Sequence, residues 1–379
     1  MLRVLAALLL ASAASAQVVI DQGKLPAPFR DFQAHGEPQL RCAVEPIKPL
    51  LNFGFRFQAG YVVRVPMNQF SGKGQRWVML MKITPEAGGR PVFLASAVGL
   101  PEVPPGTKAQ GEIAGGYLLG EGRYRVDWLL TENKGRVCRK SWKVVVRLKR
   151  GERTVKLAMA PDSVSELSLR GTASRAPADE DVRRLRLTVL LHAAPLSFRR
   201  TRMRASDRIV LLGALAALLE QLPTRHVRLA LFNLDQQKEL LRQDGFTLDG
   251  IDRVAQSMNE VELGTVDYRV LMNRRGHLEL LAGLVNREVE DGTPDAVVVL
   301  GPPARYWEKM PQDAVEKPAG PGVRFFNFQL QPYMRAMPVF PDAISYTVSR
   351  LRGKTTVIRS PGDFARAISQ ITGKVAGRN

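Results

Sequence analysis

The pattern of apolar residues changes near Arg184, and this change constrains the fold more than any other feature of the chain. Between residues 61 and 148, short runs of alternating apolar and polar residues end at Gly or Pro, which is typical of antiparallel strands. One of these runs places Tyr124, Val126 and Trp128 on the same face. The first part of the chain is therefore predicted to form an antiparallel β-sandwich of immunoglobulin-like type.

After Arg184, strand-like runs alternate with helix-like segments. The run 185–191 is rich in apolar residues and 296–300 is fully apolar. Residues 209–219 are predicted to form an almost wholly apolar helix with Ser206 as a plausible cap. Strands that are apolar on both faces and alternate with helices indicate a mostly parallel sheet covered on both sides. This part is predicted to be a doubly wound α/β domain.

The segment between the two patterns is rich in Gly, Pro, Ser and Ala, which is typical of a connector. Residues 151–183 are therefore predicted to be a linker. The β-sandwich domain then spans 17–150 and the α/β domain spans 184–379. A chain of 379 residues suits two domains of ordinary size.

Residues 1–16 have the three parts of a secretory signal peptide. Arg3 supplies the positive charge, Val4–Leu10 the apolar segment and Ala14–Ala16 the small residues before the cleavage site. The mature chain is predicted to be secreted or periplasmic. No later apolar run reaches the roughly 18 residues that a membrane span requires, so no transmembrane segment is predicted after the signal peptide.

The chain contains two cysteines, Cys42 and Cys138, and both lie in the predicted β-sandwich domain. In an oxidising compartment two lone cysteines tend to pair. We therefore predict a structural disulfide, and the alternative of two free buried thiols is disfavoured by export.

Four stretches carry a family resemblance: 187–191 (LTVLL), 226–232 (HVRLALF), 296–300 (AVVVL) and 353–365 (GKTTVIRSPGDFA). With the order of elements from 184 to about 373, they make this part similar to a von Willebrand factor A domain, especially the related domains of secreted bacterial proteins. The resemblance implies a doubly wound fold that acts through protein–protein contacts.

Such domains commonly bind a divalent cation through an Asp-x-Ser-x-Ser motif, a Thr and a further Asp, which are hard oxygen ligands. By the resemblance, these positions fall on His192, Ala194, Leu196, Thr265 and Pro302. Only Thr265 keeps its residue type, and one hydroxyl cannot hold a metal. The adhesion site is therefore predicted to be degenerate, with no bound metal and no cofactor.

Arginines occupy the predicted loops at that end of the sheet, where open α/β sheets usually bind ligands. The hypothesis is that these residues bind an acidic partner directly, since guanidinium groups pair with carboxylates. They are Arg199, Arg200, Arg202, Arg204 and Arg305. The alternative is that they are ordinary solvated residues of an arginine-rich chain.

The net charge of +19 favours anionic partners. These are an acidic protein or an anionic envelope component, with peripheral membrane contact as a further option. Nucleic acid is not predicted, because the chain is exported and carries no recognition helix, base-stacking platform or zinc motif. No nucleophile elbow, zinc-protease motif or P-loop is present, so no enzyme activity is predicted.

The sequence thus predicts an exported, non-catalytic, metal-independent interaction or adhesion module. One alternative is a basic protein that binds an envelope polymer or polysaccharide. A weaker alternative is a hydrolase that uses His192, which lies at the end of the first predicted strand of the α/β domain.

Overall fold

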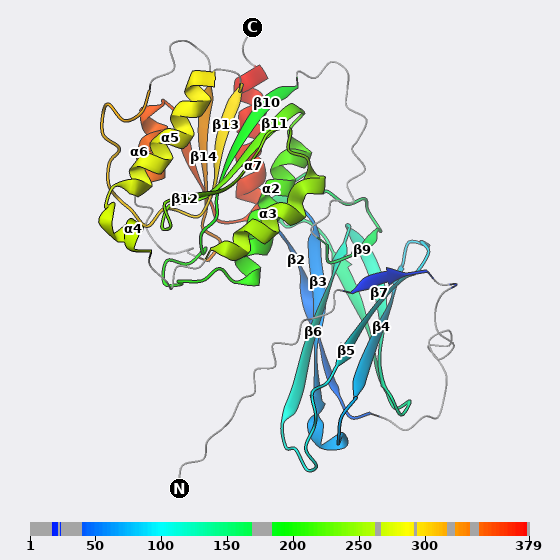
Figure 1. The fold of residues 1–379 in the computed structure, drawn as a ribbon. Helices are drawn as coiled ribbons and strands as arrows, with labels where there is room; N and C mark the ends of the chain where they lie inside the picture. Colours follow the sequence, from blue (N-terminus) through cyan, green and yellow to red (C-terminus); the bar gives the residue numbers. More distant parts are fainter. Residues whose placement is uncertain are drawn as a thin grey trace. The chain divides into compact units, whose positions relative to one another are not determined.

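Figure 1 shows the fold of the chain in a computed structural model. The structure describes residues 17–21, 23, 40–168, 184–261, 267–291, 294–316, 323–333 and 341–376. The predicted signal peptide 1–16 and residues 169–183 of the predicted linker lie outside these described residues. Among the described residues, no helix has both the length and the apolar character that a membrane crossing requires.

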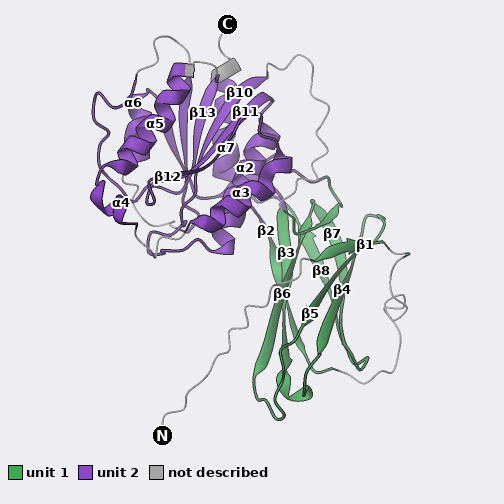
Figure 2. Cartoon of the chain, viewed as in Figure 1, with its two compact units in different colours: residues 1–50, 57–147, 160–168 green, residues 51–56, 148–159, 169–379 purple. Residues whose placement is uncertain are grey.

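The chain forms two compact units, and each unit combines separate segments of the sequence (Figure 2). Unit 1 consists of Met1–Leu50, Phe57–Arg147 and Ala160–Ser168. Unit 2 consists of Leu51–Arg56, Leu148–Met159 and Leu169–Asn379.

Unit 1 contains two antiparallel sheets. The first has the order β1-β5-β4-β7-β8, with β1 Val18–Ile20, β5 Val92–Gly99, β4 Arg76–Pro85, β7 Gly122–Glu132 and β8 Val137–Val146. The second has the order β2-β3-β6-β9, with β2 Ala43–Leu51, β3 Phe57–Pro66, β6 Gln110–Leu119 and β9 Val164–Glu166. Part of the predicted linker is thus the edge strand β9.

The core of unit 1 lies between these two sheets. The predicted inward face of β7 is buried, since Tyr124, Val126 and Trp128 are each at most 1% exposed. From the other sheet, Tyr61 on β3 meets Trp128, with ring centroids 5.4 Å apart. Period-two alternation therefore sets which side chains fill this core.

The predicted disulfide between Cys42 and Cys138 is present, with the two Cα atoms 6.2 Å apart. Cys42 directly precedes β2, the edge strand of the four-stranded sheet, and Cys138 lies in β8, the edge strand of the five-stranded sheet. The bond therefore joins the edges of two different sheets.

Unit 2 is built on a mixed six-stranded sheet of order β12-β11-β10-β13-β14-β15. Its strands are β10 Leu185–His192, β11 Thr224–Asn233, β12 Lys238–Gln243, β13 Ala296–Gly301, β14 Arg324–Leu330 and β15 Lys354–Ile358. Five strands run parallel, and β12 is antiparallel to β11. The α-helices of this unit are α2 Ala205–Gln221, α3 Ile251–Ser257, α4 Tyr268–Met272, α5 Gly276–Asp291, α6 Ala343–Arg350 and α7 Pro361–Ala376.

The predicted fold class, a β-sandwich followed by a doubly wound von Willebrand factor A-like α/β domain, is wrong. The described chain is mostly β, with fifteen strands against six α-helices. The expected alternation of strand and helix fails twice. After β11 the chain turns directly into the antiparallel strand β12, and the described residues 302–316 between β13 and β14 form no helix. Residues 248–260 contain only the seven-residue α3, between short 3-10 turns.

Residues 51–56, which come early in the chain, belong to unit 2. Arg56 pairs with Glu220 of α2 at 2.7 Å, and both side chains are less than a tenth exposed. Phe55 packs on Phe364 of α7, with ring centroids 5.7 Å apart. Residues 51–56 are therefore part of the interior of unit 2.

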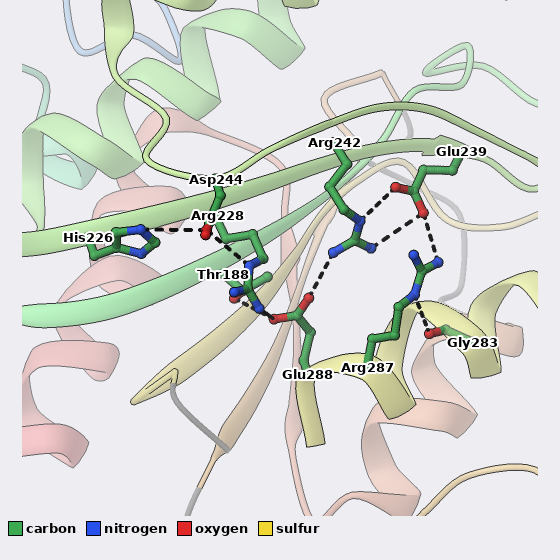
Figure 3. A network of polar contacts seen from close by, with 9 residues as sticks. All are labelled: Thr188, His226, Arg228, Glu239, Arg242, Asp244, Gly283, Arg287 and Glu288. Carbon is green, nitrogen blue, oxygen red and sulfur yellow. Dashed lines mark hydrogen bonds and ion pairs between the residues drawn. The ribbon is translucent and has the colours of Figure 1, made fainter. Parts of the chain in front are cut away.

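A network of charged side chains lies where α5 meets strands β10, β11 and β12 (Figure 3). At its centre is Glu288 of α5, which is fully buried. Its carboxylate accepts hydrogen bonds from Thr188 at 2.8 Å and from Arg228 and Arg242 at 3.1 Å each. Arg242 also bonds Glu239 at 2.7 Å. Strands β10, β11 and β12 thus each contribute one donor to a single buried carboxylate.

Candidate binding surface at the carboxyl edge of the mixed sheet

The carboxyl ends of β10, β11, β13 and β14 lie at one edge of the unit 2 sheet, because these strands are parallel. The segments that follow them are 193–204, 234–237, 302–310 and 331–333. Functional groups in such sheets gather where these segments meet. We call this region the carboxyl edge.

Arg305 and Arg200 join three of these segments. Arg305 donates a hydrogen bond from Nη2 to the Arg200 carbonyl, and its Nε lies 3.5 Å from Oδ2 of Asp235. The Arg200 guanidinium lies 6.0 Å from the centre of the Tyr333 ring, which brings in the segment after β14. The four segments therefore form a connected surface.

Helix α4 and the start of α5 extend this surface. Gln237, in the turn after β11, donates a hydrogen bond of 2.8 Å to the carbonyl of Asn273. Asp267 caps α4 by accepting a 2.9 Å bond from the backbone of Arg269. At the start of α5, a Cβ on Gly276 would collide with the Gln237 side chain, so glycine permits this close approach.

Large apolar side chains are exposed along the carboxyl edge, and they include every exposed aromatic residue among those the structure describes. With their exposed fractions they are Tyr268 (71%), Met272 (68%), Trp307 (67%), Leu271 (61%), Tyr333 (52%) and Phe198 (39%). Exposed apolar clusters on a folded protein mark interaction surfaces, and Trp and Tyr are common anchors in interfaces. We call these six residues the apolar rim.

The predicted arginines fall into two groups at this edge. Arg199, Arg202 and Arg204 are exposed and follow Phe198 of the apolar rim in the same segment. Arg200 is half-buried and lies 3.4 Å from the buried carboxylate of Asp207, and Arg305 is half-buried against Asp235. The first group therefore lies at the surface, whereas Arg200 and Arg305 are engaged in internal ion pairs.

The positions of the predicted degenerate metal site are not arranged as ligands. His192 is 2% exposed, its Nδ1 lies 3.0 Å from the Pro302 carbonyl, and Ala194 and Leu196 are buried. Thr265 lies outside the described residues. Within the parts of the chain that are described, no group of three His, Cys, Asp or Glu side chains could hold a metal ion.

The sequence analysis assigned no role to His277, which lies at the start of α5. The side chain is 1% exposed, and its ring stacks on Tyr306 with centroids 3.8 Å apart. Its Nε2 lies 3.5 Å from Oε2 of Glu308. His277 therefore supports the segment that carries Trp307 of the apolar rim.

Asp342 was also missed, and it too holds the segment after β13. It is 1% exposed and accepts a 2.5 Å bond from the backbone N–H of Ala304 and a 3.2 Å bond from Gln329. It also caps α6 by accepting from the backbone N–H of Ser345 at 2.8 Å. An Asp directly before a helix is a typical cap, which is the sequence signal that could have identified it.

Burial lowers the pKa of both His192 and His277. For His192, the Pro302 carbonyl and the carboxylates of Asp235 and Asp342 oppose this effect. For His277, the carboxylates of Glu308 and Asp235 oppose it. The pKa of Tyr306 is raised to about 12 by burial and by Asp235.

We expect unit 2 to lose stability as the pH falls below about 6.5, where a histidine of the unfolded chain becomes protonated. A folded-state pKa below this value means that the unfolded chain binds more protons, so stability rises with pH across this window. Each buried histidine contributes a slope of up to about 1.4 kcal/mol per pH unit. Thermal unfolding followed by circular dichroism between pH 5 and 8 measures this slope.

The variant His277→Phe keeps a ring against Tyr306 and cannot be protonated, so it is expected to flatten the pH dependence. His226→Gln is the control, because the His226 side chain is 45% exposed. An unchanged slope in His277→Phe would contradict the assignment of this acid sensitivity to the buried imidazole.

No protein-family model matches the chain, and no curated protein matches it. Among solved structures, it is similar to a Bordetella pertussis protein assigned to ApaA, with 15% identity over 31% of this chain and 99% of that one and a TM-score of 0.20. It is also similar to a lipoprotein from Bacteroides thetaiotaomicron, with 7% identity over 31% and 90% of the two chains and a TM-score of 0.16. The sporulation control protein Spo0M of Bacillus subtilis is similar with 8% identity over 32% of this chain and 53% of that one, and with a TM-score of 0.16. Scores this low carry no argument about fold or function.

Proposed function

We propose that the protein is an exported, non-catalytic binding protein that engages an acidic protein partner through the carboxyl edge of unit 2. The observation that carries this proposal is the apolar rim beside exposed arginines. The disulfide is compatible with an oxidising destination, the periplasm or the medium.

The charge of this surface favours an acidic partner. Between Ser197 and Arg208 the chain contains five arginines and one acidic residue, Asp207, which is fully buried. Guanidinium groups bind carboxylates with paired, charge-assisted hydrogen bonds. The surface therefore presents positive charge without a nearby exposed carboxylate in the same segment.

The apolar rim favours a protein over the alternative of an anionic polymer. Trp307, Tyr268 and Met272 each expose about two thirds of their surface, and interface cores are enriched in Trp, Tyr and Met. A polymer held by charge alone would leave these side chains in water. The burial of His192 favours a packing role for this residue over the alternative of a hydrolase.

The triple variant Arg199→Ala, Arg202→Ala and Arg204→Ala is expected to weaken partner binding at least about tenfold, because interface arginines are frequent hot spots. The partner is first captured from the producing cell's envelope with the mature protein, with and without EDTA, and identified by mass spectrometry. Its Kd for each variant is then measured by calorimetry.

The matched control removes the same charge from exposed positions of unit 1, with Arg90→Ala, Arg123→Ala and Arg147→Ala. Equal losses in both triple variants would indicate a general charge effect, as for a polymer binder, which salt would abolish. Loss of capture in EDTA would contradict metal-independent binding.

A further inference from the structure

The strand edges of unit 1 differ in their protection against pairing with a further strand. The edge strand β2 contains Pro46 and Pro49, which cannot donate backbone hydrogen bonds. The edge strand β8 exposes Arg139, Lys140 and Lys143, and β1 has only three residues. Prolines, basic side chains and short length are the usual devices against edge-to-edge association.

Strand β6 has an edge without these devices. It pairs with β3 along its whole length, from Gln110 to Leu119, whereas β9 covers only Tyr117–Leu119 on its other side. Within the described residues, no strand pairs with 110–116 on that second side. This stretch contains no proline and no basic residue. Every second residue along it therefore directs its backbone N–H and C=O away from β3.

Packing inside the sandwich explains the small residues of this edge. A Cβ on Gly111 would lie 2.9 Å from the ring of Trp77, and one on Gly115 would lie 2.5 Å from the ring of Tyr61. The alternating positions Glu112 and Ala114 are exposed. The edge is therefore unobstructed by bulky outward side chains.

The one charge on this edge is held in an ion pair. Glu112 accepts a 2.8 Å bond from Nε of Arg64 on the neighbouring strand β3, and Arg64 also pairs with Glu45. Arg64 therefore partly offsets the charge that Glu112 presents to an approaching strand.

We propose that β6 pairs in an antiparallel arrangement with β6 of a second copy of this chain, with the two-fold axis at Ile113. This register is self-complementary, since it places Glu112 opposite Ala114 and Gly111 opposite Gly115, with no like charges directly opposed. It gives backbone partners to the open edge of both copies. The pairing lies in unit 1 and is independent of the function proposed for unit 2.

Sedimentation velocity of the full mature protein tests this pairing. Concentrations up to about 1 mM are needed, because even a strand pair with a millimolar Kd is then substantially populated. The wild type is expected to show a concentration-dependent monomer–dimer equilibrium. Ala114→Glu, which sets an introduced carboxylate against Glu112 of the second copy at two symmetric places, is expected to weaken dimerisation about tenfold.

A charge exchange provides the rescue. The double variant Glu112→Lys, Ala114→Glu places opposite charges across the two-fold axis and is expected to restore dimerisation. Ala43→Glu makes the same substitution at an exposed position of the proline-containing strand β2 and is expected to leave dimerisation unchanged. Circular dichroism of each variant checks that folding is retained.

Three results would overturn the proposal. The wild type could stay monomeric at every concentration, or Ala114→Glu could dimerise as well as the wild type. Alternatively, the amides of 110–116 could become protected from hydrogen exchange only when a different protein is added, which would assign this edge to a foreign strand.

Discussion

Replacing Glu288 by Ala is expected to destabilise unit 2 by about 3 kcal/mol, because it leaves Arg228 and Arg242 without their shared buried carboxylate. The Glu288 side chain is fully buried, whereas those of Arg228 and Arg242 are 22% and 27% exposed. Because the two arginines are partly exposed, water can solvate them once the carboxylate is gone. The expected loss in the free energy of unfolding is therefore at the low end of the range for a broken buried ion pair. Urea unfolding followed by circular dichroism at 222 nm measures it, since all the described α-helices belong to unit 2.

The control for this change is Glu290→Ala, which removes an exposed carboxylate from the same helix. It is expected to change the free energy of unfolding by less than about 0.5 kcal/mol. If the two alanine variants were equally stable, the network around Glu288 would not be a stabilising element of unit 2. Glu288→Gln, which keeps one acceptor oxygen, is expected to fall between them.

Removal of the disulfide, by Cys42→Ser with Cys138→Ser, is expected to destabilise unit 1 by about 4 kcal/mol. The bond closes a loop with a sequence separation of 96 residues, and its loss releases the conformational entropy of that loop in the unfolded chain. Tryptophan fluorescence during urea unfolding reports this effect, because Trp77, Trp128 and Trp142 all lie in unit 1.

Reduction of the wild-type protein with dithiothreitol is the matched experiment and is expected to give the same shift. The transition at 222 nm, which follows the helices of unit 2, is expected to move little in either case. A fluorescence transition that stays in place after removal of the bond would show that other contacts hold β2 and β8.

The sequence predicted the features of the fold that depend on the alternation of apolar and polar residues or on residue type alone. Alternation identified the buried face of Tyr124, Val126 and Trp128, and two cysteines in a chain with a predicted signal peptide were enough to predict their disulfide. These features depend on local spacing and on the chemistry of the compartment, so a single sequence contains them.

The two places where strands and helices of unit 2 fail to alternate could not be predicted in the same way. Strand β12 has the sequence KELLRQ, whose charges obscure the strand period. Its charged side chains are accommodated because Glu239 pairs with Arg287 of α5 and Arg242 pairs with Glu288 of the same helix. Such partners are distant in sequence, so the pattern of one segment does not reveal them.

The candidate site was also only partly accessible from the sequence. The arginines of 199–204 were identified, but the apolar rim was not, because apolar residues are ordinarily expected inside. Leu271 and Met272 are exposed because α4 has only five residues. Which apolar residues remain outside is decided by the length and position of such short elements.

Residues 51–56 are synthesised long before the parts of unit 2 on which they pack. Arg56 precedes its partner Glu220 by 164 residues, so at 5–20 residues per second it is made roughly 10–30 s before that partner. Unit 2 cannot reach its final packing until α7, near the end of the chain, supplies Phe364 for Phe55. A translational pause or a premature stop after β8 would leave Phe53 and Phe55 without their contacts to Phe364 of α7.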